Sequence, residues 1–185
     1  MNVTFLHTEA TADATTQMAE LGIPYGCIHF CSEDGQNHVL AEAGTEGRAV
    51  STPLPVQGEL CALLFSRGFF PDDQPLFIAR QEPALAPRLL ERLQPAIDRG
   101  RAASIIVSAG ARTARPASSP TERVEAMTHP DTEIEGVLFA RTDLFVAQAI
   151  RALTTRSPGP HGYRLHHVIQ ELVLAGVDYD VQFAK

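Results

Sequence analysis

Strict alternation of apolar and polar residues near the start of the chain predicts a β-hairpin. In GCIHFCS, residues 26–32, both cysteines and the histidine fall on one face of an extended chain, and isoleucine and phenylalanine fall on the other. DGQN at 34–37 supplies turn residues, and HVLAEAG at 38–44 forms the return arm. NVTFLH at the start of the chain can form a further strand. RAVSTPLPV at 48–56 is extended, and its prolines favour an edge position.

Helical and strand-like patterns then follow one another to the end of the chain. The spacing of apolar residues predicts helices at 10–22, 58–68, 83–100 and 165–176. Pro87 and Pro95 punctuate the third of these, which is therefore one helix or two. Short apolar runs predict strands at 76–80, 102–110, 134–142 and 177–184. Such mixing of helices and strands predicts an α/β or α+β fold.

Two further helices are predicted from their amino-terminal residues. Ser119, with Pro120 in the first turn and Glu122 three residues on, forms a capping box for 119–127. Asp143 can cap the helix LFVAQAIRALT. The stretch at 110–120, rich in alanine, serine and proline, is the least ordered part of this pattern.

The order of these elements resembles the GAF domain, a small-molecule sensor module. MAELGIPYGCIHFCSEDGQNHVLAEAG is similar to its first helix and hairpin, and STPLPVQGELCALLFSRG to its extended segment and next helix. LERLQPAIDRGRAASIIVSAG and IEGVLFARTDLF are similar to its later helix and strands, so the resemblance spans residues 11–155. It implies a central, mostly antiparallel sheet flanked by helices, GAF/PAS-like, with a ligand pocket between the sheet and the helices after Thr52.

The resemblance also implies a division of the chain. Residues 1–155 would form one sensor-like domain, and residues 156–185 would add a helix and a strand that pack on the same domain. The segment 110–133 is a long insertion between strands that the family joins more tightly, and its role is open. GAF domains bind cyclic nucleotides, tetrapyrroles, haem or small acids, so the resemblance leaves the ligand and any cofactor unknown.

Charge and composition exclude several classes of protein. The net charge is −7, and the basic residues are nearly all arginine, which argues against a nucleic-acid-binding surface. No apolar run approaches the ~18 residues of a membrane span. MNVTFLHTEATADATTQ lacks the charged start of a signal peptide, so a cytoplasmic location is expected. Three cysteines do not indicate a disulfide framework.

The first candidate for chemistry is the strand face that carries Cys27, His29 and Cys31. Zinc needs a tetrahedral set of ligands, and structural sites usually use Cys-x-x-Cys pairs, which this chain lacks. The simplest interpretation is two small buried thiols with a hydrogen-bonded histidine. A redox or ligand-contacting role stays open, because thiols and an imidazole are more polarizable than the aliphatic residues of a packing face.

A second candidate is Cys61, which lies early in the predicted helix 58–68. The dipole at a helix amino terminus stabilises a thiolate, and a histidine such as His129, His161 or His166 could act as its base. The apolar sequence ELCALLF favours a core thiol instead.

The third candidate is the pair His166 and His167 with Glu171, four residues beyond the second histidine. Two histidines and a carboxylate can bind a metal ion. Adjacent histidines on a helix diverge by about 100°, however, so we expect one to face the core and the other the solvent. We therefore predict no metal site.

Taken together, the sequence predicts a regulatory module without catalysis of its own that binds a small ligand or a protein partner, and that can form a homodimer. The predicted ligand-binding residues are Cys27, His29 and Cys31, with Cys61 or Arg80 opposite them. Nucleic acid and membrane are not expected partners. The alternative is a cysteine-dependent hydrolase or transferase that uses Cys61 with His129 or His166.

Overall fold

The structure is a computed structural model. It describes residues 1–6, 27–31, 37–42, 48–51, 60, 63–64, 71–80, 85–108, 132–158 and 162–184, with only the backbone given for the strands between residues 27 and 51. Several predicted features lie outside these residues: the helices at 10–22 and 119–127, nearly all of the insertion 110–133, and the side chains of Cys61, His129 and His161.

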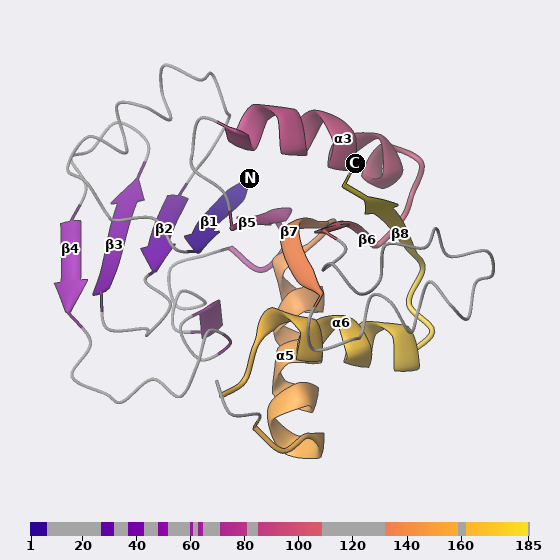
Figure 1. The fold of residues 1–185 in the computed structure, drawn as a ribbon. Helices are drawn as coiled ribbons and strands as arrows, with labels where there is room; N and C mark the ends of the chain where they lie inside the picture. Colours follow the sequence, from indigo (N-terminus) through magenta and orange to yellow (C-terminus); the bar gives the residue numbers. More distant parts are fainter. Residues whose placement is uncertain are drawn as a thin grey trace.

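The strands form one mixed sheet (Figure 1). They are β1 (Asn2–Leu6), β2 (Cys27–Cys31), β3 (Asn37–Glu42), β4 (Arg48–Ser51), β5 (Leu76–Ala79), β6 (Ala103–Ser108), β7 (Glu133–Phe139) and β8 (Tyr179–Phe183). Their order across the sheet is β4-β3-β2-β1-β5-β7-β6-β8.

The sheet is not mostly antiparallel, so that part of the prediction is wrong. β1 pairs in parallel with both β2 and β5, and β6 pairs in parallel with β8. Antiparallel pairs arise where β3 and β7 run against the other described strands. The α/β class is confirmed, whereas the GAF/PAS-like arrangement is not.

The hairpin predicted at the start of the chain is confirmed. β2 pairs with β3 in antiparallel register, with Cys27 opposite Glu42 and Cys31 opposite His38. β4 then lies at one end of the strand order, as the prolines after it predicted. Alternation thus predicted both the strands and their pairing in this region.

Helices cover both faces of the sheet (Figure 1). α3 (Ala86–Asp98) lies on one face, and α5 (Thr142–Thr155) and α6 (Leu165–Leu174) lie on the other. Side chains of β5 alternate between the two layers, since Phe77 packs in the core beneath α3 and Ile78 packs in the core beneath α5 and α6. The result is a three-layer α/β/α sandwich in the part of the chain that is described.

α3 is one continuous helix although two prolines punctuate its sequence. Pro87 sits in the first turn, where a missing N–H costs nothing, and Pro95 lies on the exposed side within three residues of the end. The buried face is formed by residues three or four apart: Ala86, Leu89, Leu93 and Ala96. The free energy gained by burying these four side chains exceeds the cost of the hydrogen bond that Pro95 cannot donate.

The C-terminal residues add α6 to one helical layer and β8 to the sheet. α6 ends just before Gly176, whose positive φ of 65° reverses the chain. β8 then pairs with β6 at the edge of the described sheet. None of the described helices is long and apolar enough to cross a membrane.

Candidate functional site

The position of β1 in the sheet marks the candidate site. The chain passes from β1 to β2 on one side and later returns to β5 on the other side, and both neighbours are parallel to β1. In open α/β sheets, a crevice forms where the strand order reverses, and ligands bind there outside the carboxyl ends of the strands. The carboxyl ends of β1, β2 and β5 are therefore the place to look for function.

Arg80 lies at this edge, directly after the last residue of β5. Its backbone N–H donates to the carbonyl oxygen of Glu135 at 2.9 Å. Its Nε donates to the carbonyl oxygen of Ile134 at 3.3 Å. Because strand side chains alternate, Arg80 follows Ile78 onto the face covered by α5 and α6.

A β-bulge holds Arg80 in place. Ile106 of β6 lies opposite Gly136 of β7, but the next residue, Val107, lies opposite Ile134, so Glu135 is the extra residue. Bulges bend a strand, re-aim nearby side chains and occur often beside active sites. These two bonds from Arg80 go to carbonyls at or next to this bulge. The irregularity thus sets the position of a charged residue at the edge where a ligand would bind.

The amino terminus of α6 brings further basic residues to the same face. Arg164 directly precedes the helix, and its backbone N–H donates to Nδ1 of His167 at 2.9 Å. Nδ1 of His167 also lies 3.2 Å from the carbonyl oxygen of Arg164, so the tautomer decides whether this nitrogen donates or accepts. The rings of His166 and His167 lie 3.9 Å apart and are tilted by 34°. His167 is buried and His166 is half-buried.

The surroundings of His166 are strongly basic. Burial is the largest cause that lowers its pKa, followed by the charges of His167, Arg164, Arg156 and Arg80, and together they bring the pKa to about 4. His166 is therefore neutral at pH 7. We call these residues, Arg80, Arg156, Arg164, His166 and His167, the basic cluster.

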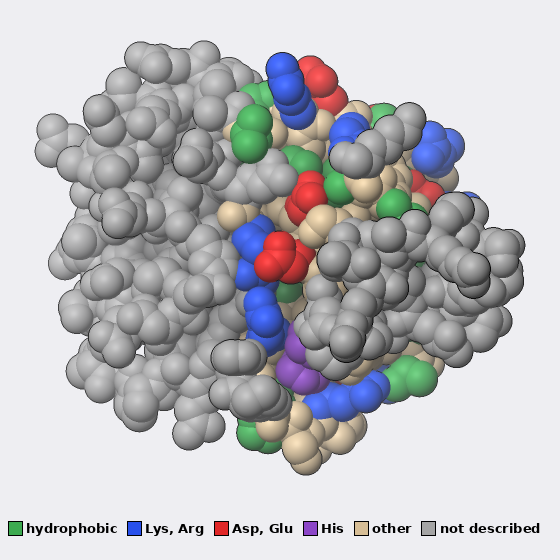
Figure 2. Space-filling model, in the orientation of Figure 1, with side chains coloured by type: hydrophobic (Ala, Val, Ile, Leu, Met, Phe, Trp, Pro, Cys, Tyr) green, Lys and Arg blue, Asp and Glu red, His purple; other side chains and the backbone are tan. Residues whose placement is uncertain are grey.

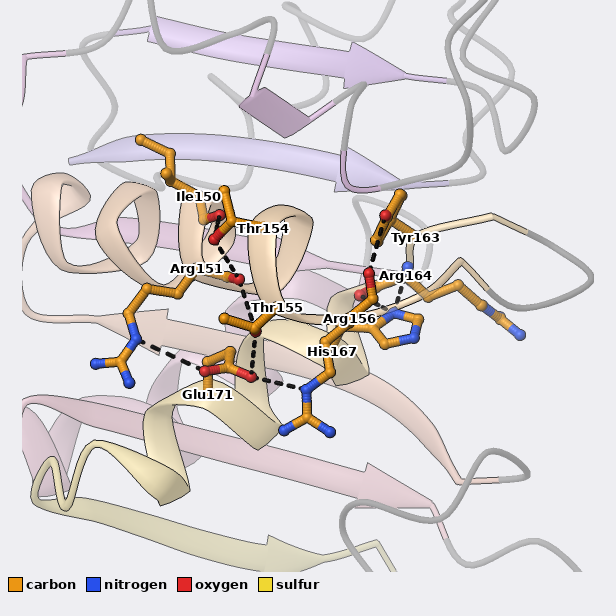
Figure 3. A network of polar contacts seen from close by, with 9 residues as sticks. All are labelled: Ile150, Arg151, Thr154, Thr155, Arg156, Tyr163, Arg164, His167 and Glu171. Carbon is orange, nitrogen blue, oxygen red and sulfur yellow. Dashed lines mark hydrogen bonds and ion pairs between the residues drawn. The ribbon is translucent and has the colours of Figure 1, made fainter.

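A buried carboxylate holds one member of the basic cluster (Figure 3). Glu171 is only 2% exposed and accepts hydrogen bonds from Arg156 Nε at 2.7 Å and from Thr155 Oγ1 at 3.1 Å. Arg151 Nε lies 3.6 Å from its second oxygen. Burial alone would raise the pKa of Glu171, but these partners lower it. Glu171 therefore binds arginines and is not placed with the two histidines as a metal ligand.

Figure 2 shows one face of the molecule with its side chains coloured by type. Arginine, acidic and histidine side chains lie in a column down the middle of the face shown. Among the described residues, no three His, Cys, Asp or Glu side chains gather in a way that could hold a metal ion.

The structure brings only some of the predicted site residues together. Since β1 is parallel to both neighbours, Cys31 at the end of β2 and Arg80 after β5 lie at the same edge, with β1 between them. The side chains of Cys27, His29 and Cys31 lie outside the described residues, as does Cys61.

Two residues of the basic cluster escaped the sequence reasoning. Arg156 ends α5 and Arg164 precedes α6, and no local motif marks either of them. The feature that could have pointed to Arg156 and Arg164 is their position at helix ends, one at the end of α5 and the other at the start of α6. Asp143, predicted as the cap of α5, instead lies inside its first turn, where Arg141 binds its carboxylate.

Comparison with known proteins gives a fold but no family. No protein-family model matches the chain, and no curated protein matches it. Among solved structures, 4-diphosphocytidyl-2C-methyl-D-erythritol synthase from Anaerococcus prevotii matches 100% of this chain and 88% of its own, with a TM-score of 0.56 and 9% identity. A Bacillus anthracis protein assigned as glucose-1-phosphate thymidylyltransferase matches 99% of this chain and 67% of its own, with a TM-score of 0.47 and 10% identity.

These findings correct two predictions. The resemblance to the GAF domain is wrong, because the fold that matches along the whole chain is that of 4-diphosphocytidyl-2C-methyl-D-erythritol synthase. The interpretation as a sensor-like regulatory module without catalysis rested on that resemblance and is corrected with it, because the structure that shares the fold is named as a synthase and not as a sensor. At 9% identity the likeness concerns the fold alone.

Proposed function

We propose that this chain is an enzyme of the nucleotidyltransferase type that acts on phosphate-bearing substrates at the carboxyl edge of β1, β2 and β5. The observation that carries the proposal is the reversal of strand order at β1, in a fold that matches along its whole length an enzyme named for a diphosphocytidyl product. The cysteine-dependent alternative has no support in the described residues, because Cys61 and His129 lie outside them.

The reaction needs positive charge more than it needs a nucleophilic side chain. An oxygen of the acceptor's phosphate attacks the α-phosphorus of a nucleoside triphosphate. The bond from that phosphorus to the oxygen shared with the β-phosphate breaks, and pyrophosphate leaves with the electron pair. Negative charge builds on the phosphate oxygens along this path, so preorganised cations and N–H donors lower the barrier.

Arg80 is suited to this role. Its guanidinium is charged at every physiological pH and has five N–H donors in a planar fork that matches phosphate oxygens. The bond from Nε to Ile134 fixes the group beside the β7 bulge, at the edge where substrates would enter. We assign Arg80 to binding the phosphates of the substrate. The end of β2 at Cys31 lies at the same edge and is part of the proposed binding region.

Phosphoryl transfer commonly uses Mg²⁺, which prefers carboxylate oxygens as ligands. The part of the chain that is described holds no group of three His, Cys, Asp or Glu side chains that fits such an ion. We therefore derive no step through a metal and assign no residue to hold one.

Pyrophosphate release tests the proposed function. The protein is mixed with each of the four common ribonucleoside triphosphates and with a panel of sugar and polyol phosphates, in buffer that contains Mg²⁺. Pyrophosphate is followed with a coupled pyrophosphatase assay. We expect release that requires both a nucleotide and a phosphorylated acceptor. Absence of release with every pair, together with no binding of any nucleotide by calorimetry, would overturn the proposal.

A further inference from the structure

β8 is the last strand of the described sheet, so only one of its sides faces another described strand (Figure 1). Such an edge strand presents a row of N–H and C=O groups that can pair with a further chain. Natural edges are commonly blocked by proline, lysine or a bulge. The sequence YDVQF of β8 contains neither proline nor lysine, and its register with β6 has no shift from Tyr179 to Phe183. β8 therefore lacks these three features.

The main chain of β8 alternates between β6 and the open edge. The N–H of Ala102 donates to the carbonyl oxygen of Asp178 at 2.9 Å. The N–H of Ala184 donates to the carbonyl oxygen of Val107 at 2.8 Å. The even-numbered residues before and after β8 thus point their main-chain groups toward β6, and the odd-numbered residues between them point theirs outward. The outward residues are Tyr179, Val181 and Phe183.

Apolar side chains run along the same edge. Tyr179, Val181 and Phe183 pack against the core beneath α5 and α6 but stay partly exposed. Val177, which leads from α6 into β8, belongs to the same set. A chain paired with β8 would lie beside this strip and cover it, so burial of apolar area would add to the main-chain hydrogen bonds.

The charge of Asp180 decides which register suits a second copy of β8. Two antiparallel copies related by a two-fold axis pair around one central residue. An axis at Asp180 would place two carboxylates opposite each other, which destabilises a strand pair. An axis at Val181, the middle residue of β8, pairs the whole strand and places Asp180 opposite Gln182 of the second copy. One N–H of the Gln182 amide donates to the carbonyl oxygen of Arg92 at 2.9 Å, and the second can donate to that carboxylate.

We propose that β8 binds β8 of a second copy of this chain, antiparallel and centred on Val181, so that one sheet continues through a homodimer. Val181 then exchanges both N–H···O bonds with Val181 of the second copy, and Tyr179 does so with Phe183. The contact is the same patch on both copies and closes after two of them, so it does not lead to filaments. β6 and β7 separate β8 from β5, so the interface lies away from the candidate site.

Sedimentation equilibrium of the full chain measures the association at roughly 1 to 200 µM, the range expected for an interface of modest area. Hydrogen exchange at both ends of this range, read at single-residue resolution by mass spectrometry, shows which surface forms the dimer. In the dimer, the outward N–H groups of Tyr179, Val181 and Phe183 should exchange at least tenfold more slowly than in the monomer. Those of Asp180 and Gln182 face β6 and should change much less. A monomer over the whole range, or a dimer in which the outward groups are not protected, would overturn the proposal.

Gln182→Lys tests the register of the two strands. It places an ammonium group opposite Asp180 of the second copy and should strengthen the dimer at least threefold. Glu91→Gln, on the exposed side of α3, changes the net charge by the same amount and should leave the dimer unchanged. If both variants change dimerisation equally, the axis does not lie at Val181 and the proposed pairing is rejected.

Val181→Pro tests the edge itself. The N–H of Val181 points away from β6, so proline removes a bond across the proposed interface and none within the chain. We expect this variant to keep the circular dichroism spectrum of the parent protein and to stay monomeric at the highest concentration. A folded variant that dimerises with unchanged affinity would refute the proposal. If the variant does not fold, the hydrogen exchange of the unaltered chain decides between the outcomes.

Discussion

Replacing Glu171 with glutamine should destabilise the protein far more than breaking an ion pair on its surface. The side chain of Glu171 is 3% exposed, whereas those of its partners Arg156 and Arg151 are 31% and 51% exposed. Glutamine keeps the size of the side chain and can still accept from Thr155, so the change removes mainly the charge. The two arginines then lose a buried anion that offsets their own charges.

The magnitude follows from these exposures. Removing one partner of a fully buried ion pair costs about 3–5 kcal/mol. Both arginines here reach solvent and can be rehydrated, which reduces the cost, and we expect a loss of about 2 kcal/mol in the free energy of unfolding. For a chain of this length, about 1 kcal/mol shifts the melting temperature by about 2–4 °C. The Glu171→Gln variant should therefore melt about 4–8 °C below the parent protein.

Urea unfolding at pH 7, followed by circular dichroism, measures the effect. Asp178→Asn is the matched control, because Arg101 and Asp178 form an ion pair whose side chains are 45% and 61% exposed. Pairs this exposed contribute at most about 1 kcal/mol. If Glu171→Gln costs no more than Asp178→Asn, with an unchanged denaturant slope, the buried charge of Glu171 does not stabilise the fold more than an exposed ion pair does.

Two further changes test the packing and the charge around the site. Because the pKa of His166 is about 4 when folded and 6.5 otherwise, the unfolded chain binds more protons between these values, and stability should fall as the pH drops through that window. His166→Gln should remove about 1–2 kcal/mol of this fall after allowance for solvent screening, measured as the difference in urea midpoints between pH 7 and pH 4; an unchanged difference would count against the assignment. Leu93→Ala empties a fully buried position on the inner face of α3 and should cost about 2–5 kcal/mol, whereas Leu85→Ala, 41% exposed, should cost less than about 0.5 kcal/mol by the same measurement.

Local pattern predicted most of the strands but not their directions. The alternation in CIHFC and the turn residues at 34–37 were enough to predict β2, β3 and their antiparallel pairing. The parallel pairing of β2 with β1 depends on how the chain crosses the sheet between them, and alternation is the same in either direction. The loose apolar patterns with glycines are therefore equally compatible with a GAF-like order of elements and with the order that is observed.

The site was harder to predict than the elements that carry it. Arg80 was named as a ligand-binding candidate only through the GAF-like arrangement, in which it would lie opposite Cys27, His29 and Cys31. Arg164 lies only two residues before His166, whereas Arg80 and Arg156 reach the surroundings of His166 only because β5, α5 and α6 pack together. The sequence pattern does not show which residues will surround a charged side chain at a helix end. The three-dimensional packing of the helices determines those neighbours.

The most direct test of the account is the effect of Arg80→Ala on nucleotide-dependent pyrophosphate release. Arg101→Ala serves as the control, since it removes an arginine from the opposite edge of the sheet. If substrates bind at the carboxyl edge of β1 and β5, Arg80→Ala should lower kcat/KM at least tenfold while the circular dichroism spectrum stays the same, and Arg101→Ala should keep the parent value. Equal activity of Arg80→Ala and the parent protein would contradict the placement of the active site.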